Sequence, residues 1–278
     1  MQNGRGSRTA ERVAERRAAH QLLDAPRVFE DPLALRILDP HVASQLAANP
    51  LEFESSLIAP YMRAALAVRS RFAEDSLRDA VLSRGIRQYV VLGAGFDTFA
   101  YRNPFADLRV FEVDHPSTQA VKRERLAAAD IAVPQNLTFV PIDFASSRLA
   151  DVLKLDGPAF FSWLGVVPYL ELDAIRETFR FVASLARGSE LVFDYGSPRE
   201  SLSFLARRVF DRLAERVAAA GEPFKSFFEP GELRRILRED GFSIVEDLTP
   251  DDLNRRYFDG RRDGLRIGEM AHLARAVV

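Results

Sequence analysis

The sequence predicts an α/β protein built on a doubly wound, Rossmann-like parallel sheet. Three observations carry this prediction. Short apolar runs alternate with amphipathic stretches from residue 88 onward, the first run ends in a glycine turn, and the next two end in aspartate. Strands that alternate with helices form right-handed parallel units, which build such a sheet. A chain of 278 residues is long enough to bury one large core.

The first 84 residues are predicted to form an N-terminal helical cap region, ahead of a Rossmann-like core over residues 85–278. Apolar residues recur there at three- and four-residue spacing, which is typical of amphipathic helices. Helices are expected over Thr9–Leu23, from Pro32 onward with Asp31 as the N-cap, and over Leu57–Val81.

The core is expected to begin with five buried strands separated by helices. The first strand runs from Gln88 into the glycines, and the others cover Leu108–Asp114, Leu137–Ile142, Ala159–Leu164 and Ser189–Tyr195. The helical stretches between them cover Asp97–Tyr101, Thr118–Ala129, Ser147–Leu153 and Leu172–Leu185. This alternation predicts that the five strands are parallel.

Beyond the fifth strand, a helical insertion is expected at about residues 197–240. It contains two helical patterns, over Arg199–Ala220 and Pro230–Asp240. Two further apolar runs, in "GFSIVEDL" and "MAHLARAVV", predict late strands. Because a loop rather than a clear helix separates them, we expect an antiparallel pair at the edge of the sheet.

The composition excludes several classes of site and partner. A net charge of -2 gives no strong attraction to nucleic acid or anionic membranes, and no apolar run is long enough to span a bilayer. The chain has no cysteine for disulfides or thiolate metal sites, and its 4 histidines lack paired ligand spacing, so no metal is expected. The first residues lack the apolar core of a signal peptide. We therefore expect a cytoplasmic protein, monomeric or homodimeric, that acts on a small molecule.

The ends of the first three strands predict a cofactor site. "YVVLGAG" ends with Gly93, Ala94 and Gly95, a turn that allows positive φ and a close approach of ligand to backbone. Asp114 closes the next strand 19 residues after Gly95, a spacing suited to hydrogen bonding of a ribose diol. Asp143 closes the third strand, where a carboxylate can accept from an adenine amino group. The set predicts a cofactor that contains adenosine.

The residues after the glycine turn distinguish between two such cofactors. Thr98 stands where a dinucleotide site usually has its third glycine, and Asp97 would repel a phosphate. An acid suits the cationic amino-acid end of S-adenosylmethionine, whose product is S-adenosylhomocysteine. An NAD(P)-dependent oxidoreductase remains the alternative enzyme class.

Several segments together resemble a known family. "LGAGFDTFAYR" followed by "FEVDHP" is similar to the leucine carboxyl methyltransferase-like group of S-adenosylmethionine-dependent O-methyltransferases, and "EDPLALRIL", "AVRSRFAEDSL" and "FSWLGVVPYLELDAI" are also family-like. Bacterial members include enzymes of secondary metabolism. The resemblance implies the class I methyltransferase fold, which is a seven-stranded sheet with N-terminal helices that help to cover the cofactor.

The resemblance also implies roles for individual residues. Arg69 matches the arginine that binds the cofactor carboxylate, with Arg71 as the neighbouring alternative. The glycine turn and the aspartate at the second strand end, with His115 beside it, would hold the cofactor. Asp143 and Phe144 would bind or flank its adenine. Many members have a glutamate at the position of Leu164, which would lie at the cofactor. This chain therefore lacks the acid that the resemblance implies at the end of the fourth strand.

The acceptor is expected to bind beside the cofactor in an aromatic pocket. Its candidate lining residues are Trp163, Tyr169, Tyr195, Phe204, Phe224, Phe227 and Phe228. A carboxylate acceptor needs no general base, whereas a phenol or alcohol benefits from one. The candidate catalytic residues are His115, Tyr169 and His272. The missing acid leaves open a third alternative, a cofactor-binding homologue without catalytic activity.

Overall fold

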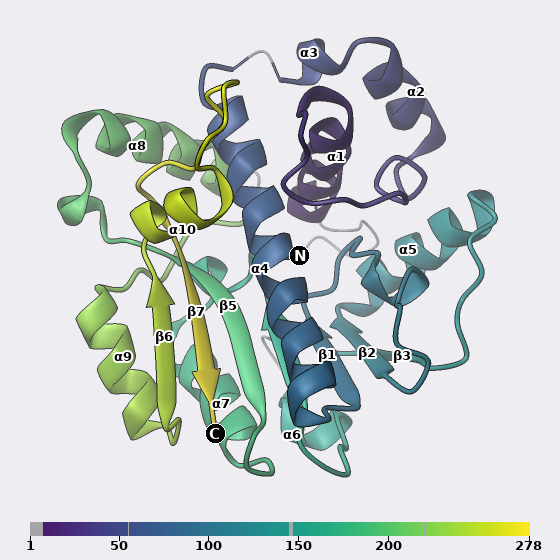
Figure 1. Cartoon of the computed structure of the whole chain (residues 1–278), viewed down its shortest axis with the longest axis vertical. Helices are drawn as coiled ribbons and strands as arrows, with labels where there is room; N and C mark the ends of the chain where they lie inside the picture. Colours follow the sequence, from purple (N-terminus) through teal and green to yellow (C-terminus); the bar gives the residue numbers. More distant parts are fainter. Residues whose placement is uncertain (1–7, 55, 145–146, 220) are drawn as a thin grey trace.

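The computed structural model describes residues 8–54, 56–144, 147–219 and 221–278 of the chain. Within them, seven strands form one sheet in the order β3-β2-β1-β4-β5-β7-β6 (Figure 1). The strands are β1 Gln88–Leu92, β2 Arg109–Asp114, β3 Leu137–Pro141, β4 Phe160–Trp163, β5 Glu190–Gly196, β6 Ile244–Leu248 and β7 Ala271–Val277. The first five pair in parallel, and β7 is antiparallel to both β5 and β6. The predicted doubly wound α/β fold is confirmed.

Helices cover both faces of this sheet. The α-helices are α1 Arg8–Leu23, α2 Pro40–Ala48, α3 Pro50–Phe53, α4 Ala59–Arg84, α5 Pro116–Ala128, α6 Leu149–Val152, α7 Leu172–Ala183, α8 Phe204–Ala219, α9 Pro230–Glu239 and α10 Pro250–Tyr257. Among the described residues, three short 3₁₀ helices are η1 Phe99–Tyr101, η2 Val167–Tyr169 and η3 Arg199–Ser201. No helix in the described part of the chain combines the length and the apolar character needed to cross a membrane.

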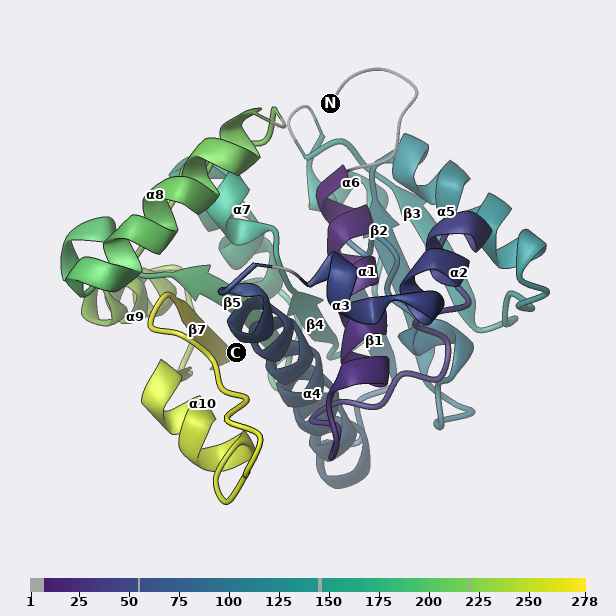
Figure 2. The same cartoon turned by 90° about the horizontal axis from the view of Figure 1, so that it is seen from above.

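The two faces of the sheet bury separate clusters of side chains. On one face, α4 and α10 pack Phe72 and Leu253 against Val91 and Phe160 (Figures 1 and 2). On the other face, α6, α7 and α9 cover a second cluster that includes Trp163. Successive residues of a strand point to opposite faces, so the side of each strand-end side chain follows from these clusters. The division predicted after residue 84 stays a prediction, although α4 before it contributes to the core of the sheet.

The first helix, α1, is held against α4 and the glycine turn by apolar packing and buried ion pairs. Ala14 and Ala18 pack with Phe96 in a third cluster. Arg63 of α4 donates to Asp24 at 2.7 and 2.9 Å, and both side chains are buried. Two hydrogen bonds between charged groups fix the position of the end of α1 on α4.

The helix predicted from Pro32 is wrong, because residues 32–37 form consecutive turns. Asp31 does accept from the backbone N–H of Leu33 at 3.0 Å, as a cap would. The same carboxylate also pairs with Arg17 at 2.9 Å and accepts from Thr98 at 2.7 Å. These tertiary contacts hold the segment in a conformation that local propensity does not indicate.

The late strands pair antiparallel at the sheet edge as predicted, but the loop predicted between them is wrong. Helix α10 lies there and begins with a capping box, in which Thr249 and Asp252 bond each other's backbone N–H. Pro250 occupies the first turn, where a missing N–H does no harm. The capping residues of "TPDD" were the signal for this helix.

Candidate cofactor and acceptor site

The glycine turn after β1 has the backbone that its sequence predicts. Gly93 and Gly95 have φ of +68° and +49°, in the left-handed region that other residues rarely adopt. The N–H groups of Gly93 and Ala94 donate to the carbonyl of Val113 at 2.8 and 3.1 Å. A Cβ on Gly93 would overlap the side chain of Val166 in the loop after β4. The turn therefore brings the ends of β1 and β4 into close contact.

Asp114 at the end of β2 points back to this turn. Its carboxylate accepts from the N–H of Gly95 and, at 2.6 Å, from the N–H of His115. Burial raises the pKa of this carboxyl, although the two backbone N–H groups act to lower it. The acid is thus fixed beside the turn, where the sequence places the ribose of the cofactor.

Helix α1 covers the glycine turn. A Cβ on Gly95 would lie 3.3 Å from the Cβ of Ala10, and Arg17 donates to the carbonyl of Phe96 at 2.5 Å. Glu11 of the same helix pairs with Arg125 of α5 at 2.8 Å. The N-terminal helices therefore lie directly over the predicted cofactor site, as the resemblance implies.

No full helix follows the turn to receive a phosphate. The helix expected over Asp97–Tyr101 is shorter than predicted, since only the 3₁₀ turn η1 forms. Asp97 accepts from the N–H of Phe99 at 2.8 Å, so a carboxylate already bonds an N–H that a phosphate would otherwise use. Dinucleotide sites place the pyrophosphate at a helix N-terminus, and this chain has neither that helix nor a favourable charge there.

Arg69, rather than its neighbour Arg71, faces the site. Its Nη1 donates to Asp194 at 2.9 Å, and both side chains are largely buried. The guanidinium lies against Gly165, which has φ of +73°, and a Cβ there would be 2.8 Å from both terminal nitrogens. Arg71 is half exposed and pairs with Asp75 one turn along α4 at 2.9 Å. A cation is thus held where β4 and β5 end.

Replacing Gly165 by alanine is expected to weaken S-adenosylhomocysteine binding about tenfold. The new Cβ would displace the Arg69 guanidinium. The alanine would also have to keep a left-handed backbone conformation, which costs about 1–3 kcal/mol. Calorimetric titration measures the loss. Gly157→Ala is the control, because its Cβ would meet only Gln88, at an ordinary 3.7 Å. Equal affinities of the two variants would contradict this role of Gly165.

A cavity of about 170 Å³ lies beside Arg69, Gly165 and Asp194. A void of about 150 Å³ accepts a benzene molecule, so this space fits one ring-sized group. Its wall is mainly apolar and aromatic. The side chains that α4, α8 and the following loop bring to it include Met62, Ala65, Leu66, Phe210, Leu213, Phe224 and Phe227.

Of the three catalytic candidates, His115, Tyr169 and His272, Tyr169 directs its side chain toward this cavity. It belongs to η2, and its ring lies 5.3 Å from that of Phe224. Burial raises the pKa of Tyr169 to about 12. The phenol therefore stays protonated at neutral pH and is suited to donate a hydrogen bond rather than to remove a proton.

Tyr195 and His272 border the cavity, but their side chains project to the opposite face of the sheet. The two residues pair across β5 and β7, and their rings stack at 4.9 Å. Tyr195 donates to Asp247 at 2.8 Å within the cluster under α7 and α9. Asp194, the neighbour of Tyr195, points to α4 instead. The pleats of β5 and β7 thus turn both rings away from α4, although both residues border the cavity.

Three other pocket predictions are also corrected by the structure. Trp163 is fully buried against Phe179 at 6.0 Å, and Phe228 packs in the same cluster below β5. Phe204 is 72% exposed in the first turn of α8. Phe210 of the same helix lies about 240° around the axis from Phe204, so it faces the cavity when Phe204 faces away.

The remaining predicted residues do not line this cavity. His115 is the N-cap of α5 and accepts from the N–H of Ser117 at 3.2 Å. Asp143 and Phe144 are half-buried just beyond the end of β3. Leu164 packs toward α4 with the first cluster, next to Gly165. The roles predicted for these four residues at the cofactor stay predictions.

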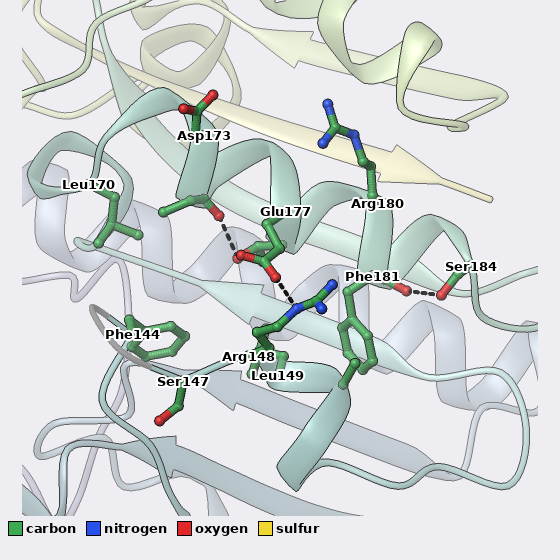
Figure 3. Close-up of a pocket in the computed structure, with 13 residues that line it drawn as sticks. Phe144, Ser147, Arg148, Leu149, Leu170, Asp173, Glu177, Arg180, Phe181 and Ser184 are labelled. Carbon is green, nitrogen blue, oxygen red and sulfur yellow. Dashed lines mark hydrogen bonds and ion pairs between the residues drawn. The ribbon is translucent and has the colours of Figure 1, made fainter.

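A larger groove of about 520 Å³ lies between α6 and α7 (Figure 3). Of the predicted cofactor residues, it contains only Phe144, at one end. Arg148 and Glu177 pair across it at 2.5 Å, but both are well exposed, so the pair contributes little. Neither Arg69 nor a glycine of the turn lines this groove, and its size alone does not make it the reaction site.

Asp194 is the functional candidate that sequence reasoning missed. It lies inside an apolar strand, "ELVFDYG", where a charged residue has to be paired or open to a site. This charged residue in an apolar strand was the sequence feature that could have identified Asp194. Its partner Arg69 is 125 residues away in sequence, so the pair itself could be found only in the structure.

The sequence is similar to those of known methyltransferases. The sequence profile of the leucine carboxyl methyltransferase family matches residues 10–183. A putative S-adenosyl-L-methionine-dependent methyltransferase of Bacillus subtilis, YktD, is 33% identical over 306 aligned positions, which cover 100% of this chain and 99% of that protein. A putative methyltransferase of the same description from Parafrankia is 34% identical over 60% of this chain and 56% of its own length.

Solved structures share the fold at low sequence identity. A putative methyltransferase from Thermobifida fusca superposes with a TM-score of 0.60 at 17% identity, covering 99% of this chain and 96% of its own. A DUF574-family protein from Streptomyces avermitilis gives a TM-score of 0.56 at 19% identity, over 94% and 96% of the two chains. With the family profile and the full-length relative, they lead to one conclusion. The chain belongs to the leucine carboxyl methyltransferase family of S-adenosylmethionine-dependent methyltransferases.

Proposed function

We propose that this enzyme methylates an oxygen atom of a small acceptor about the size of one ring. The observation that supports the proposal is the apolar cavity beside Arg69 and Gly165, at the end of the sheet where the glycine turn lies. Ligands of open parallel sheets bind beyond the carboxyl ends of the strands. Cofactor and acceptor would therefore meet where the cavity adjoins Arg69.

The residues present suit S-adenosylmethionine. This cofactor supplies a methyl group bound to a positively charged sulfur. Asp114 offers a fixed carboxylate to the ribose, and Arg69 offers a guanidinium to the carboxylate of the amino-acid end. Helix α1 and the aromatic wall of the cavity would keep water from the reacting atoms, and positioning is the main contribution of such a protein.

The proposed acceptor oxygen is one that is already ionised near neutral pH, in a carboxylic acid or an acidic phenol. Neither His115 nor His272 directs its ring into the cavity, and Tyr169 keeps its proton because its pKa is about 12. In the part of the chain that is described, no histidine side chain is thus available there as a base. An ionised oxygen needs none.

The experiment is methyl transfer from radiolabelled S-adenosylmethionine to a panel of single-ring carboxylic acids and phenols. Treatment of the product with mild base separates the two classes, because methyl esters hydrolyse and phenolic ethers do not. Transfer to either class supports the proposal. A protein that binds the cofactor and labels no oxygen acceptor would instead be an inactive homologue or a methyltransferase for another atom.

Filling the cavity is expected to block the acceptor without affecting the cofactor. Ala65→Phe adds a ring to a space of about 170 Å³, so KM for an accepted acceptor should rise at least about tenfold. The affinity for S-adenosylhomocysteine should stay within about twofold. Phe204→Ala is the control, because that ring is exposed on the far side of α8. A larger effect of Phe204→Ala than of Ala65→Phe would place the acceptor elsewhere.

Other expectations from the sequence are part of the same proposal. They are a cytoplasmic location, a place in secondary metabolism, and a monomeric or homodimeric state. Nucleic acid and membrane surfaces are not proposed as partners, because the net charge is only -2.

A further inference from the structure

Asp194 and Arg69 form an ion pair at the point where the cofactor site meets the acceptor cavity. Nη1 of Arg69 lies 2.9 Å from Oδ2 of Asp194, and the N–H of Gly165 donates to Oδ1 at 2.5 Å. All three residues line the cavity. The pair thus brings one positive and one negative group to an otherwise largely apolar wall.

The sheet register explains why this carboxylate lies on β5. Trp163 of β4 pairs with Phe193 of β5, so the next residues along the two parallel strands, Leu164 and Asp194, are also neighbours. Both side chains point toward α4, because the pleat turns Trp163 and Phe193 to the other face. The end of β5 therefore presents a carboxylate beside Leu164.

The pair is also able to exchange partners. The side chains of Arg69 and Asp194 are 14% and 16% exposed, which leaves both open at one edge. Each oxygen of a carboxylate has two lone-pair sites, and Asp194 uses one on each oxygen in the bonds described. It can accept a further donor without losing the N–H of Gly165.

We propose that Asp194 binds the ammonium group of the cofactor's amino-acid end while Arg69 binds its carboxylate. A zwitterion carries both charges on one carbon, and a cation beside an anion complements it. Asp97, the acid that the sequence suggested for the ammonium, follows the glycine turn and does not line the cavity beside Arg69, whereas Asp194 does. The inference rests on S-adenosylmethionine as the cofactor, and the experiment below separates the two claims.

The experiment is calorimetric titration with two ligands, S-adenosylhomocysteine and its deamino analogue, which keeps the carboxylate. Asp194→Asn is expected to weaken S-adenosylhomocysteine about ten- to hundredfold, the range for a hydrogen bond between charged groups. The deamino analogue should change by less than about threefold. The affinity of the wild type for S-adenosylhomocysteine should also fall as pH rises through the pKa of the ligand's amino group, and this fall should be absent from the variant.

Asp247→Asn is the matched control. Asp247 is also largely buried in the same sheet, at 5% exposure, but it faces the other side, where it accepts from Tyr195 at 2.8 Å. Asp247→Asn should change the affinity neither for S-adenosylhomocysteine nor for the deamino analogue. Should Asp194→Asn fail to fold, the wild type still tests the proposal, since it must bind S-adenosylhomocysteine at least about tenfold more tightly than the deamino analogue.

Each other result has a defined meaning. An equal loss for both ligands would overturn the proposal, because Asp194 would then only position Arg69. Unchanged or tighter binding of S-adenosylhomocysteine would overturn it too, because Asp194 would then only compete for Arg69. Failure of the wild type to bind S-adenosylhomocysteine would instead overturn the cofactor on which the inference rests.

Discussion

Asp114→Ala is expected to weaken S-adenosylhomocysteine binding by at least about a hundredfold. In the proposed site the carboxylate accepts from ribose hydroxyls, and hydrogen bonds to charged groups contribute about 1.5–3 kcal/mol each. The variant also frees the N–H of Gly95, which Asp114 holds in the turn. Calorimetric titration measures the affinity, and thermal unfolding shows whether the fold is kept.

The fold is expected to survive this change, because Asp114 is only half-buried and makes its hydrogen bonds within the turn. Asp156→Ala is a suitable control, since that side chain is 72% exposed. If both Asp114→Ala and the control bind S-adenosylhomocysteine with wild-type affinity, Asp114 is not the residue that binds the ribose.

Lys122→Met is expected to cause the largest loss of stability, about 3–5 kcal/mol in the free energy of unfolding. Lys122 of α5 lies 2.6 Å from Glu112 of β2, and both side chains are 1% exposed. Removing the cation leaves a buried carboxylate without its charge partner, and one of its oxygens has no hydrogen bond even in the intact pair. Urea unfolding at pH 8 measures the change.

The sign of the pH dependence follows from Glu112. Burial raises its pKa to about 7 despite the neighbouring Lys122. A raised carboxyl pKa means that the folded state binds the proton more tightly than the unfolded state does. Protonation of Glu112 therefore stabilises the fold fully below about pH 4.5, and this stabilisation is lost as the pH rises to about 7. In Lys122→Met this loss should be larger and should extend to higher pH.

The double variant Glu112→Met/Lys122→Met is the control for this pair. Replacing both partners of a buried ion pair by apolar groups is often neutral, so most of the stability should return. A single Lys122→Met variant that loses less than about 1 kcal/mol at pH 8 would contradict an energetic role for the pair.

The sheet could be predicted because its buried strands are short, apolar and closed by glycine or aspartate. The position of Asp114 beside the glycine turn was predictable for the same reason, since strand ends meet at one edge of the sheet. Helix α10 was missed although its capping residues were visible, because only one turn of apolar pattern follows them. The segment after Asp31 could not be predicted, since distant ion pairs set its conformation.

The lining of the aromatic cavity was less predictable than the glycine turn and the acid beside it. An aromatic residue in a strand or helix can face core, solvent or cavity, and the sequence does not state which. Tyr195 and Asp194 are adjacent in sequence, yet the pleat sends one to the core and the other to the site. Phe204 and Phe210 differ in the same way around the axis of α8. Such choices depend on strand register and helix rotation, which arise from packing over the whole chain.

The most direct test of this account is calorimetric titration of the intact protein with S-adenosylhomocysteine and NAD in parallel. We expect S-adenosylhomocysteine to bind and NAD not to bind, because Arg69 and Asp194 suit an amino acid and no full helix follows the glycine turn to bind a phosphate. Binding of NAD without S-adenosylhomocysteine would contradict it.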